Sequence, residues 1–273
     1  MTRRELIDAI QKKRSVLCVG LDTDLARIPT HLQQEDDPIF VFNKAIVDAT
    51  APYTVAYKLN IAFYEAEGVA GWQSLDKIVK YIRQHYPDIF LIADAKRGDI
   101  GNTAERYARS FFHTLDFDSV TLSPYMGKDS ITPFLGHEGK WAIVLGLTSN
   151  KGSADVQQLA SNDERVYQKV MRTVAGWGSK NDIMFVVGAT NESELADIRQ
   201  RFPRHFFLIP GVGAQGGDLN TVLSQTFIPG EGGVLINSSR GIIYASDGQD
   251  FAEAAGREAK RMVGEMEVFF DEE

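Results

Sequence analysis

Acidic and basic side chains crowd the end of one apolar run of this sequence. In LIADAKRGDIGNTAE (residues 91–105), Asp94, Lys96 and Asp99 lie within six positions, and Lys58 lies near the end of an earlier run. Buried charges are costly unless they are paired, so a purely structural strand should not end this way. Two lysines and two aspartates of alternating sign would keep one another ionised. Such a set can hold positive charge and a proton beside a reacting carbon, whereas an ion-pair network alone would add little net stability.

These side chains need rigid elements to bring them together. Short apolar runs alternate with longer segments whose apolar residues recur every three or four positions, which predicts strands alternating with helices. Near-continuous apolar strands in that alternation are typical of a parallel sheet buried on both faces. Eight strands without a linker or a break in composition favour a closed (β/α)8 TIM barrel, a single domain over residues 1–273, rather than an open sheet. The predicted strands cover residues 15–22, 54–60, 89–96, 119–124, 141–147, 183–189, 205–211 and 233–239.

Polar residues fall repeatedly at the C-terminal ends of the predicted strands. Barrel enzymes assemble their sites on that face, because the loops after the strands converge there. The pattern is therefore the first argument that the chain is an enzyme. The residues concerned are Asp22, Lys58, Asp94, Lys96, Ser123, Ser149, Pro210, Ser238 and Arg240.

A glycine-rich stretch after the seventh predicted strand suggests a phosphate site. GVGAQGGD (residues 211–218) has four glycines in eight positions, so its backbone N–H groups can approach an anion closely. Such a loop alone is weak evidence, but Arg240 follows the eighth strand and can form a bidentate pair with phosphate. Gln215 offers a neutral donor from a loop that could close as a lid.

Other residues near these motifs have structural interpretations. Asn102 and Glu105 have the spacing of a capping box, which would begin a helix. Arg97 has no matching functional role, and it is expected to be a solvated surface charge. Cys18, the only cysteine, lies in an apolar run, and we expect a buried, inert thiol.

The composition excludes several classes of function. The chain is 44% hydrophobic and 24% charged, with a net charge of −8 and no long basic run, which disfavours nucleic acid and anionic membranes as partners. No window is apolar enough to span a membrane, and the N-terminus does not have the pattern of a signal peptide. A cytoplasmic protein is expected. The five histidines show no metal-ligand spacing, so no metal is expected.

The segment DAKRGDIGNT resembles the signature of the orotidine 5'-phosphate decarboxylase family, Asp-x-Lys-x-x-Asp with a threonine four residues further on. Asp94, Lys96, Asp99 and Thr103 match this pattern. Related sugar-phosphate decarboxylases and aldolase-like barrels share the first part of it. The resemblance becomes specific because it continues, in order, along nearly the whole chain.

At the other strand ends the likeness is residue by residue. Asp22 in GLDTD resembles the family's ribose-binding aspartate, and Lys58 resembles its second-strand lysine. Ser149 resembles the serine that contacts the pyrimidine. The segments IPGVGAQGGD, with Pro210 and Gln215, and NSSRGI, with Arg240, resemble its phosphate-binding segments. The length and an extra N-terminal helix are similar to the longer bacterial branch of the family.

The resemblance implies a specific activity, the cofactor-free conversion of orotidine 5'-monophosphate to uridine 5'-monophosphate and CO2 in pyrimidine synthesis. Lys96 would stabilise the developing carbanion and then donate the proton. Asp94 would keep Lys96 charged and crowd the substrate carboxylate, while Lys58 would position Asp94 and bind a ribose hydroxyl. By resemblance alone we expect a homodimer in which Asp99 and Thr103 reach into the partner's site.

Two alternatives stay open at this point. A 3-keto-6-phosphogulonate decarboxylase or hexulose-phosphate synthase would share the barrel and the Asp-x-Lys-x-x-Asp pattern but would require Mg²⁺. A catalytically silent barrel could bind nucleotides without turning them over. Retention of both lysines and both aspartates argues against the silent barrel, because a binding protein gains little from that cluster.

Overall fold

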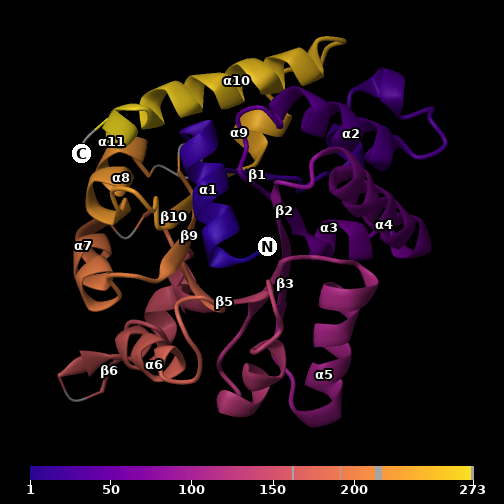
Figure 1. Ribbon diagram of the computed structural model, residues 1–273. Helices are drawn as coiled ribbons and strands as arrows, with labels where there is room; N and C mark the ends of the chain where they lie inside the picture. Colours follow the sequence, from indigo (N-terminus) through magenta and orange to yellow (C-terminus); the bar gives the residue numbers. More distant parts are fainter. Residues whose placement is uncertain (162, 191, 213–216, 272–273) are drawn as a thin grey trace.

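Eight parallel strands close into a barrel in the computed structural model, which describes residues 1–161, 163–190, 192–212 and 217–271 (Figure 1). The strand order around the barrel is β1-β10-β9-β8-β5-β4-β3-β2, and every neighbouring pair is parallel. Each strand overlaps one of the eight predicted runs, so the predicted (β/α)8 barrel is confirmed. The strands are β1 (Leu17–Gly20), β2 (Ala56–Asn60), β3 (Phe90–Arg97), β4 (Ser119–Leu122), β5 (Trp141–Leu147), β8 (Ile183–Val187), β9 (Phe206–Pro210) and β10 (Val234–Ser238). A separate antiparallel sheet lies outside the barrel and consists of two strands of two residues each, β6 (Ala160–Ser161) and β7 (Glu164–Arg165).

Helices surround the barrel and cover its outer face (Figure 1). Three segments with the predicted helical period, residues 74–86, 166–178 and 193–202, fall largely in α4, α6 and α7. The α-helices are α1 (Arg3–Lys13), α2 (Pro38–Thr50), α3 (Ile61–Glu65), α4 (Gly68–His85), α5 (Gly101–Arg109), α6 (Val166–Ala175), α7 (Glu192–Arg201), α8 (Leu219–Thr226), α9 (Arg240–Ile243), α10 (Phe251–Met266) and α11 (Val268–Asp271). No helix in the described ranges is long and apolar enough to cross a membrane.

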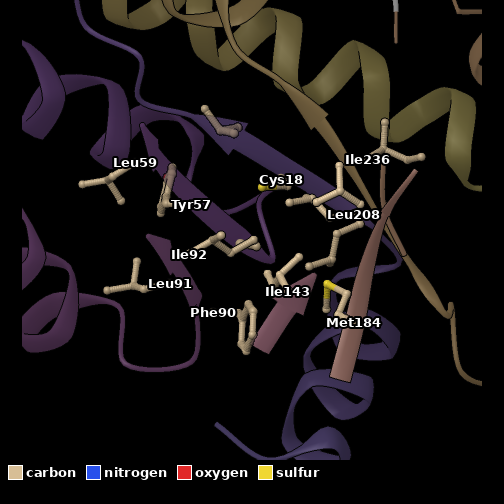
Figure 2. Close-up of a cluster of buried hydrophobic side chains, with 14 of the residues drawn as sticks. Cys18, Tyr57, Leu59, Phe90, Leu91, Ile92, Ile143, Met184, Leu208 and Ile236 are labelled. Atoms are coloured by element: carbon tan, nitrogen blue, oxygen red, sulfur yellow. The ribbon is translucent and has the colours of Figure 1, made fainter. Parts of the chain in front are cut away.

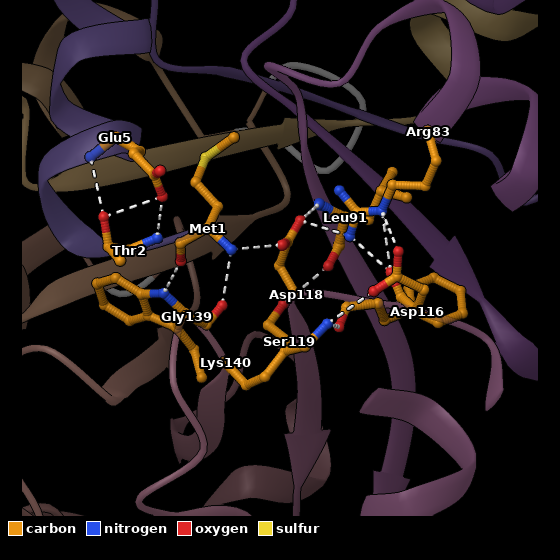
Figure 3. A network of polar contacts seen from close by, with 12 residues as sticks. Met1, Thr2, Glu5, Arg83, Leu91, Asp116, Asp118, Ser119, Gly139 and Lys140 are labelled. Atoms are coloured by element: carbon orange, nitrogen blue, oxygen red, sulfur yellow. Dashed lines mark hydrogen bonds and ion pairs between the residues drawn. The ribbon is translucent and has the colours of Figure 1, made fainter. Parts of the chain in front are cut away.

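The extra N-terminal helix, α1, lies at the end of the barrel where the strands begin. Thr2 and Glu5 form a capping box that starts this helix, and the helix buries apolar residues on one face. The Met1 amino group donates to Asp118 Oδ1 at 2.7 Å, just before β4 (Figure 3). Asp118 also pairs with Arg83 at 2.9 Å, which ties α4 to the same point. This end of the barrel is therefore occupied by α1, and the opposite mouth carries the candidate site.

The barrel core is apolar and continuous (Figure 2). Phe90, Leu91 and Ile92 of β3 are all fully buried, as expected for a strand covered on both faces. Cys18 is also fully buried, and burial raises the pKa of its thiol far above the ordinary value. The prediction of a buried thiol is confirmed.

Two local predictions were wrong. Arg97 is not a solvated charge: its side chain is only 22% exposed, pairs with Glu65 at 2.5 Å and lies over the ring of Tyr107. The capping box is absent as well, because α5 already begins at Gly101 and the preceding residue is Ile100, which has no capping side chain. Asn102 and Glu105 therefore lie inside the helix rather than at its boundary.

Candidate active site

The end of β3 carries an irregularity that shapes the site. β3 and β4 pair regularly at Ala93, and the register then shifts before Arg97. Within this shift Lys96 has a left-handed backbone, with φ of 46°, a conformation that residues other than Gly and Asn rarely adopt. The simple two-residue alternation of a strand predicted that Asp94 and Lys96 would face the same space. They do meet, but through this left-handed residue rather than through regular alternation.

Lys58, Asp94 and Lys96 form a continuous chain of alternating charge. Lys58 Nζ lies 3.0 Å from Asp94 Oδ2, and Lys96 Nζ lies 2.6 Å from Asp94 Oδ1. Lys58 also contacts Asp22 Oδ1 at 3.2 Å, which adds the end of β1 to the chain. The side chain of Lys58 is 5% exposed and that of Lys96 is 52% exposed, so the chain runs from the barrel interior to the open mouth.

The two buried members of this chain keep their charges because of each other. Burial alone would lower the pKa of Lys58, but the carboxylates of Asp22 and Asp94 outweigh it and raise the pKa above the ordinary value. Burial would likewise raise the pKa of Asp94, yet Lys58 and Lys96 hold that pKa well below its ordinary value. Both groups are therefore ionised at neutral pH in a mostly dry environment.

A cavity of about 500 Å³ opens at the C-terminal ends of the strands, beside this charge chain. Leu145, Val186 and Leu208 contribute apolar side chains to its wall. Its size is within the range of about 300–1,000 Å³ typical of small-molecule sites. Pro210, Gly211 and Val212 line it at the end of β9. The polar lining residues are Asp22, Asp24, Arg27, Lys58, Asn60, Asp94, Lys96, Thr121, Asn237, Ser238, Ser239, Arg240 and Tyr244.

Arg240, which is predicted to bind phosphate, lines the cavity at the end of β10. Arg240 begins α9 directly after β10, and it forms no ion pair with any described residue. Ser239, the preceding residue, donates to Asp22 Oδ2 at 2.8 Å and so joins this end to the charge chain. Gly211 has φ of 96°, which only glycine adopts readily, and it turns the chain at the end of β9. Gln215 lies outside the described residues.

The family model for "Orotidine 5'-phosphate decarboxylase / HUMPS family" matches residues 15–255 of this chain. The chain belongs to this family. It is 56% identical to an orotidine 5'-phosphate decarboxylase from Phocaeicola vulgatus over 268 residues, 98% of each chain. It is 53% identical to another from Flavobacterium johnsoniae over 99% of each chain. Among solved structures, Leishmania donovani OMP decarboxylase aligns with a TM-score of 0.82 and 36% identity over 98% of this chain and all of that one.

Not every residue that resembles the decarboxylase pattern lies in the cavity. Asp22, Lys58, Asp94, Lys96, Pro210 and Arg240 line it. Ser149 follows β5 but is not among the lining residues. Asp99 and Thr103 also lie outside the lining: the Asp99 carboxylate accepts the N–H of Ile100 at 2.8 Å, and Thr103 is exposed on α5.

Sequence reasoning missed several residues that line the cavity. Asn60 follows Lys58 by two positions in β2, so the same alternation that placed Lys58 could have identified it. Tyr244 lies one helical turn after Arg240, and Arg27 stacks on its ring at 4.1 Å. Thr121 lies in the middle of a predicted apolar strand and gave no signal. The described residues contain no group of three or more His, Cys, Asp or Glu side chains that could hold a metal ion.

Proposed function

We propose that this chain decarboxylates orotidine 5'-monophosphate to uridine 5'-monophosphate, with Lys96 as the proton donor. The observation that carries the proposal is the Lys58–Asp94–Lys96 chain, in which two ammonium groups and a carboxylate of low pKa line one cavity. Membership of the family and the names of relatives at 53–56% identity support the same substrate.

The reaction needs positive charge beside carbon 6 of the pyrimidine. The bond from C6 to the carboxyl carbon breaks, its electron pair stays on C6, and CO2 leaves. The Lys96 ammonium then gives a proton to C6, which forms the C–H bond of the product and leaves a neutral amine that solvent reprotonates. A fixed ammonium stabilises the carbanion without reorganisation at the moment of reaction, because Asp94 already holds it at 2.6 Å.

Asp94 has a second role in this scheme. Its buried carboxylate stays ionised beside the place where the substrate carboxylate would bind, so it disfavours the ground state more than the transition state, in which that charge has left. Lys58 holds Asp94 from the opposite side and would donate a hydrogen bond to a ribose hydroxyl. Asp22, which contacts Lys58 and Ser239, would accept a hydrogen bond from a ribose hydroxyl.

The phosphate would bind where Arg240 lines the cavity. Arg240 supplies a guanidinium without a competing carboxylate among the described residues, and guanidinium pairs bidentately with phosphate. Gln215 and Ser149 are assigned to phosphate and pyrimidine, respectively, from the family resemblance.

We also propose a homodimer in which Asp99 and Thr103 serve the partner's site. Both residues lie outside the cavity of their own chain. Ile100 is 46% exposed and Tyr125 is 88% exposed, although both are large and apolar. Ile100 directly follows Asp99 after β3, and Tyr125 follows the neighbouring strand β4, so a subunit contact on this side of the barrel would bury both.

The test is an ultraviolet assay for loss of orotidine 5'-monophosphate, run with and without EDTA. We expect turnover that EDTA does not reduce, with uridine 5'-monophosphate and CO2 as products. Turnover that is lost with EDTA and restored by Mg²⁺, or activity only on sugar phosphates, would favour the metal-dependent enzymes of the same barrel group. Nucleotide binding without turnover would instead indicate the silent barrel.

A further inference from the structure

A buried hydroxyl group joins the backbone of Lys96 to the carboxylate of Asp94. Thr121 lies in β4, the strand that pairs with β3, and is 1% exposed. Its Oγ1 accepts the backbone N–H of Lys96 at 2.9 Å and lies 2.9 Å from Asp94 Oδ1. One side chain therefore touches both partners of the proposed proton donor pair.

The direction of these two hydrogen bonds is fixed by the available protons. The Lys96 amide can only donate, so it fills a lone pair of the hydroxyl oxygen, and the ionised Asp94 can only accept. The hydroxyl proton must therefore point at Asp94 Oδ1, the same oxygen that accepts from Lys96 Nζ at 2.6 Å. Since Lys58 occupies Oδ2, the carboxylate is held by three donors and cannot rotate without breaking one of them.

The same hydroxyl supports the unusual backbone of Lys96. A residue other than glycine in the left-handed region is strained and persists only when its surroundings hold it there. The register shift between Ala93 and Arg97 leaves the Lys96 N–H facing a side chain of β4, and Thr121 supplies the acceptor. Regular pairing resumes beyond it, where Ser123 N donates to the Arg97 carbonyl at 2.7 Å.

We propose that Thr121 is a positioning residue for the decarboxylation: its hydroxyl locks the backbone of Lys96 and the carboxylate of Asp94, so that the ammonium faces the reacting carbon. This proposal rests on the proposed function. Thr121 moves no proton to the substrate. It acts through Lys96 and Asp94, and its loss should affect kcat more than KM.

The experiment compares Thr121→Val, which removes the hydroxyl but keeps the branched shape, with Thr121→Ser, which keeps the hydroxyl but removes the methyl group. Thr226→Val is the matched control, because Thr226 is equally buried but its hydroxyl donates to the Val222 carbonyl of its own helix, away from the site. Values of kcat and KM for orotidine 5'-monophosphate are measured for each variant from pH 4 to 9, with thermal unfolding as the check on folding.

We expect Thr121→Val to lower kcat by about 10²-fold and to change KM little. A displacement of a catalytic group by about 1 Å causes a loss of this size. Thr121→Ser should recover kcat to within about fivefold of wild type, and Thr226→Val should match wild type, since neither change removes the hydroxyl at the site.

Two results would overturn the proposal. One is a folded Thr121→Val enzyme with kcat within threefold of wild type. The other is Thr121→Ser as slow as Thr121→Val, which would assign the loss to packing rather than to the hydroxyl. If Thr121→Val does not fold, Thr121→Ala takes its place in the same comparison. An inactive wild-type enzyme would refute the proposed function and this inference together, whereas an active wild type with an unimpaired Thr121→Val refutes only the inference.

Discussion

Replacing Asp94 by asparagine removes the one negative charge that holds both lysines of the site. The carboxylate accepts from Lys96 Nζ at 2.6 Å, from Thr121 Oγ1 at 2.9 Å and from Lys58 Nζ at 3.0 Å. Asparagine keeps the shape but has one acceptor oxygen, and its NH2 group would face a donor on the other side. At least one contact to an ammonium group must therefore be lost, and the other becomes a hydrogen bond to a neutral group.

The magnitude follows from these contacts. A hydrogen bond to a charged group contributes about 1.5–3 kcal/mol, and two of them are weakened or lost. If the loss falls on the transition state, about 3–6 kcal/mol corresponds to a fall of about 10²–10⁴ in kcat, at about 1.4 kcal/mol for each factor of ten. Substrate binding should not suffer, because the same change removes a negative charge beside the substrate carboxylate. KM should stay the same or fall.

The assay measures kcat and KM for orotidine 5'-monophosphate in wild type, Asp94→Asn and a control, Asp48→Asn. Asp48 pairs with Lys44 at 2.7 Å and accepts from Tyr81 on the outside of the barrel, so the control tests for loss of a carboxylate remote from the site. It should keep the wild-type kcat. A folded Asp94→Asn enzyme with kcat within tenfold of wild type would refute the reasoning, as would a raised KM with kcat unchanged.

Four further predictions test the remaining assignments. Lys96→Ala should fold but lose at least about 10²–10⁴ in kcat, because it removes both the proton donor and the charge beside the carbanion; a tenth of wild-type activity in the purified variant would contradict this. Mixing inactive Lys96→Ala and Asp99→Ala subunits should restore activity, because a heterodimer has one site with both wild-type groups. If activity does not recover after subunit exchange has been demonstrated, the site is not shared between subunits. Arg240→Ala should lower kcat/KM for the nucleotide by a factor that corresponds to the loss of several kcal/mol of phosphate binding, more than the roughly 0–1 kcal/mol of a surface ion pair. The slow turnover of orotidine without its phosphate should barely change, and equal losses on both substrates would make Arg240 structural. Burial lowers the pKa of His205 to about 4 in the folded chain. As the pH falls below about 6.5, the unfolded chain therefore binds a proton at this histidine that the folded chain does not bind, and the free energy of unfolding decreases. His205→Gln should lose less thermal stability than wild type between pH 7 and pH 5, and an identical loss would refute this.

The barrel could be predicted because its signal is repeated. Each strand is covered on both faces, so it reads as an unbroken apolar run, as Phe90, Leu91 and Ile92 do, and eight such runs leave few other architectures. The position of the charged residues after these runs then predicted which mouth of the barrel holds the site. Asp22 and Arg240, more than 200 residues apart in the chain, line one cavity for this reason.

Local geometry around the site could not be predicted in the same way. Strand alternation carries no information about a register shift, so neither the left-handed Lys96 nor the role of Thr121, an ordinary strand residue, was visible in the sequence. Arg97 was misjudged because its partners, Glu65 and Tyr107, come from helices on either side in the chain, and only the folded structure brings them to its guanidinium.

The register of three neighbouring strands explains why the charges of the site are fixed. Gly20 of β1 pairs with Lys58, and Asn60 of β2 pairs with Asp94, so the two charged residues lie diagonally across one pair of strands. The Lys58 carbonyl accepts the N–H of Leu21 at 2.9 Å, which continues the backbone hydrogen bonding to the segment that carries Asp22. The backbone ladder of the barrel therefore sets the separations of these charges. A change in these backbone positions would have to break that ladder, and for this reason Lys58 and Asp94 can act as a preorganised electrostatic field.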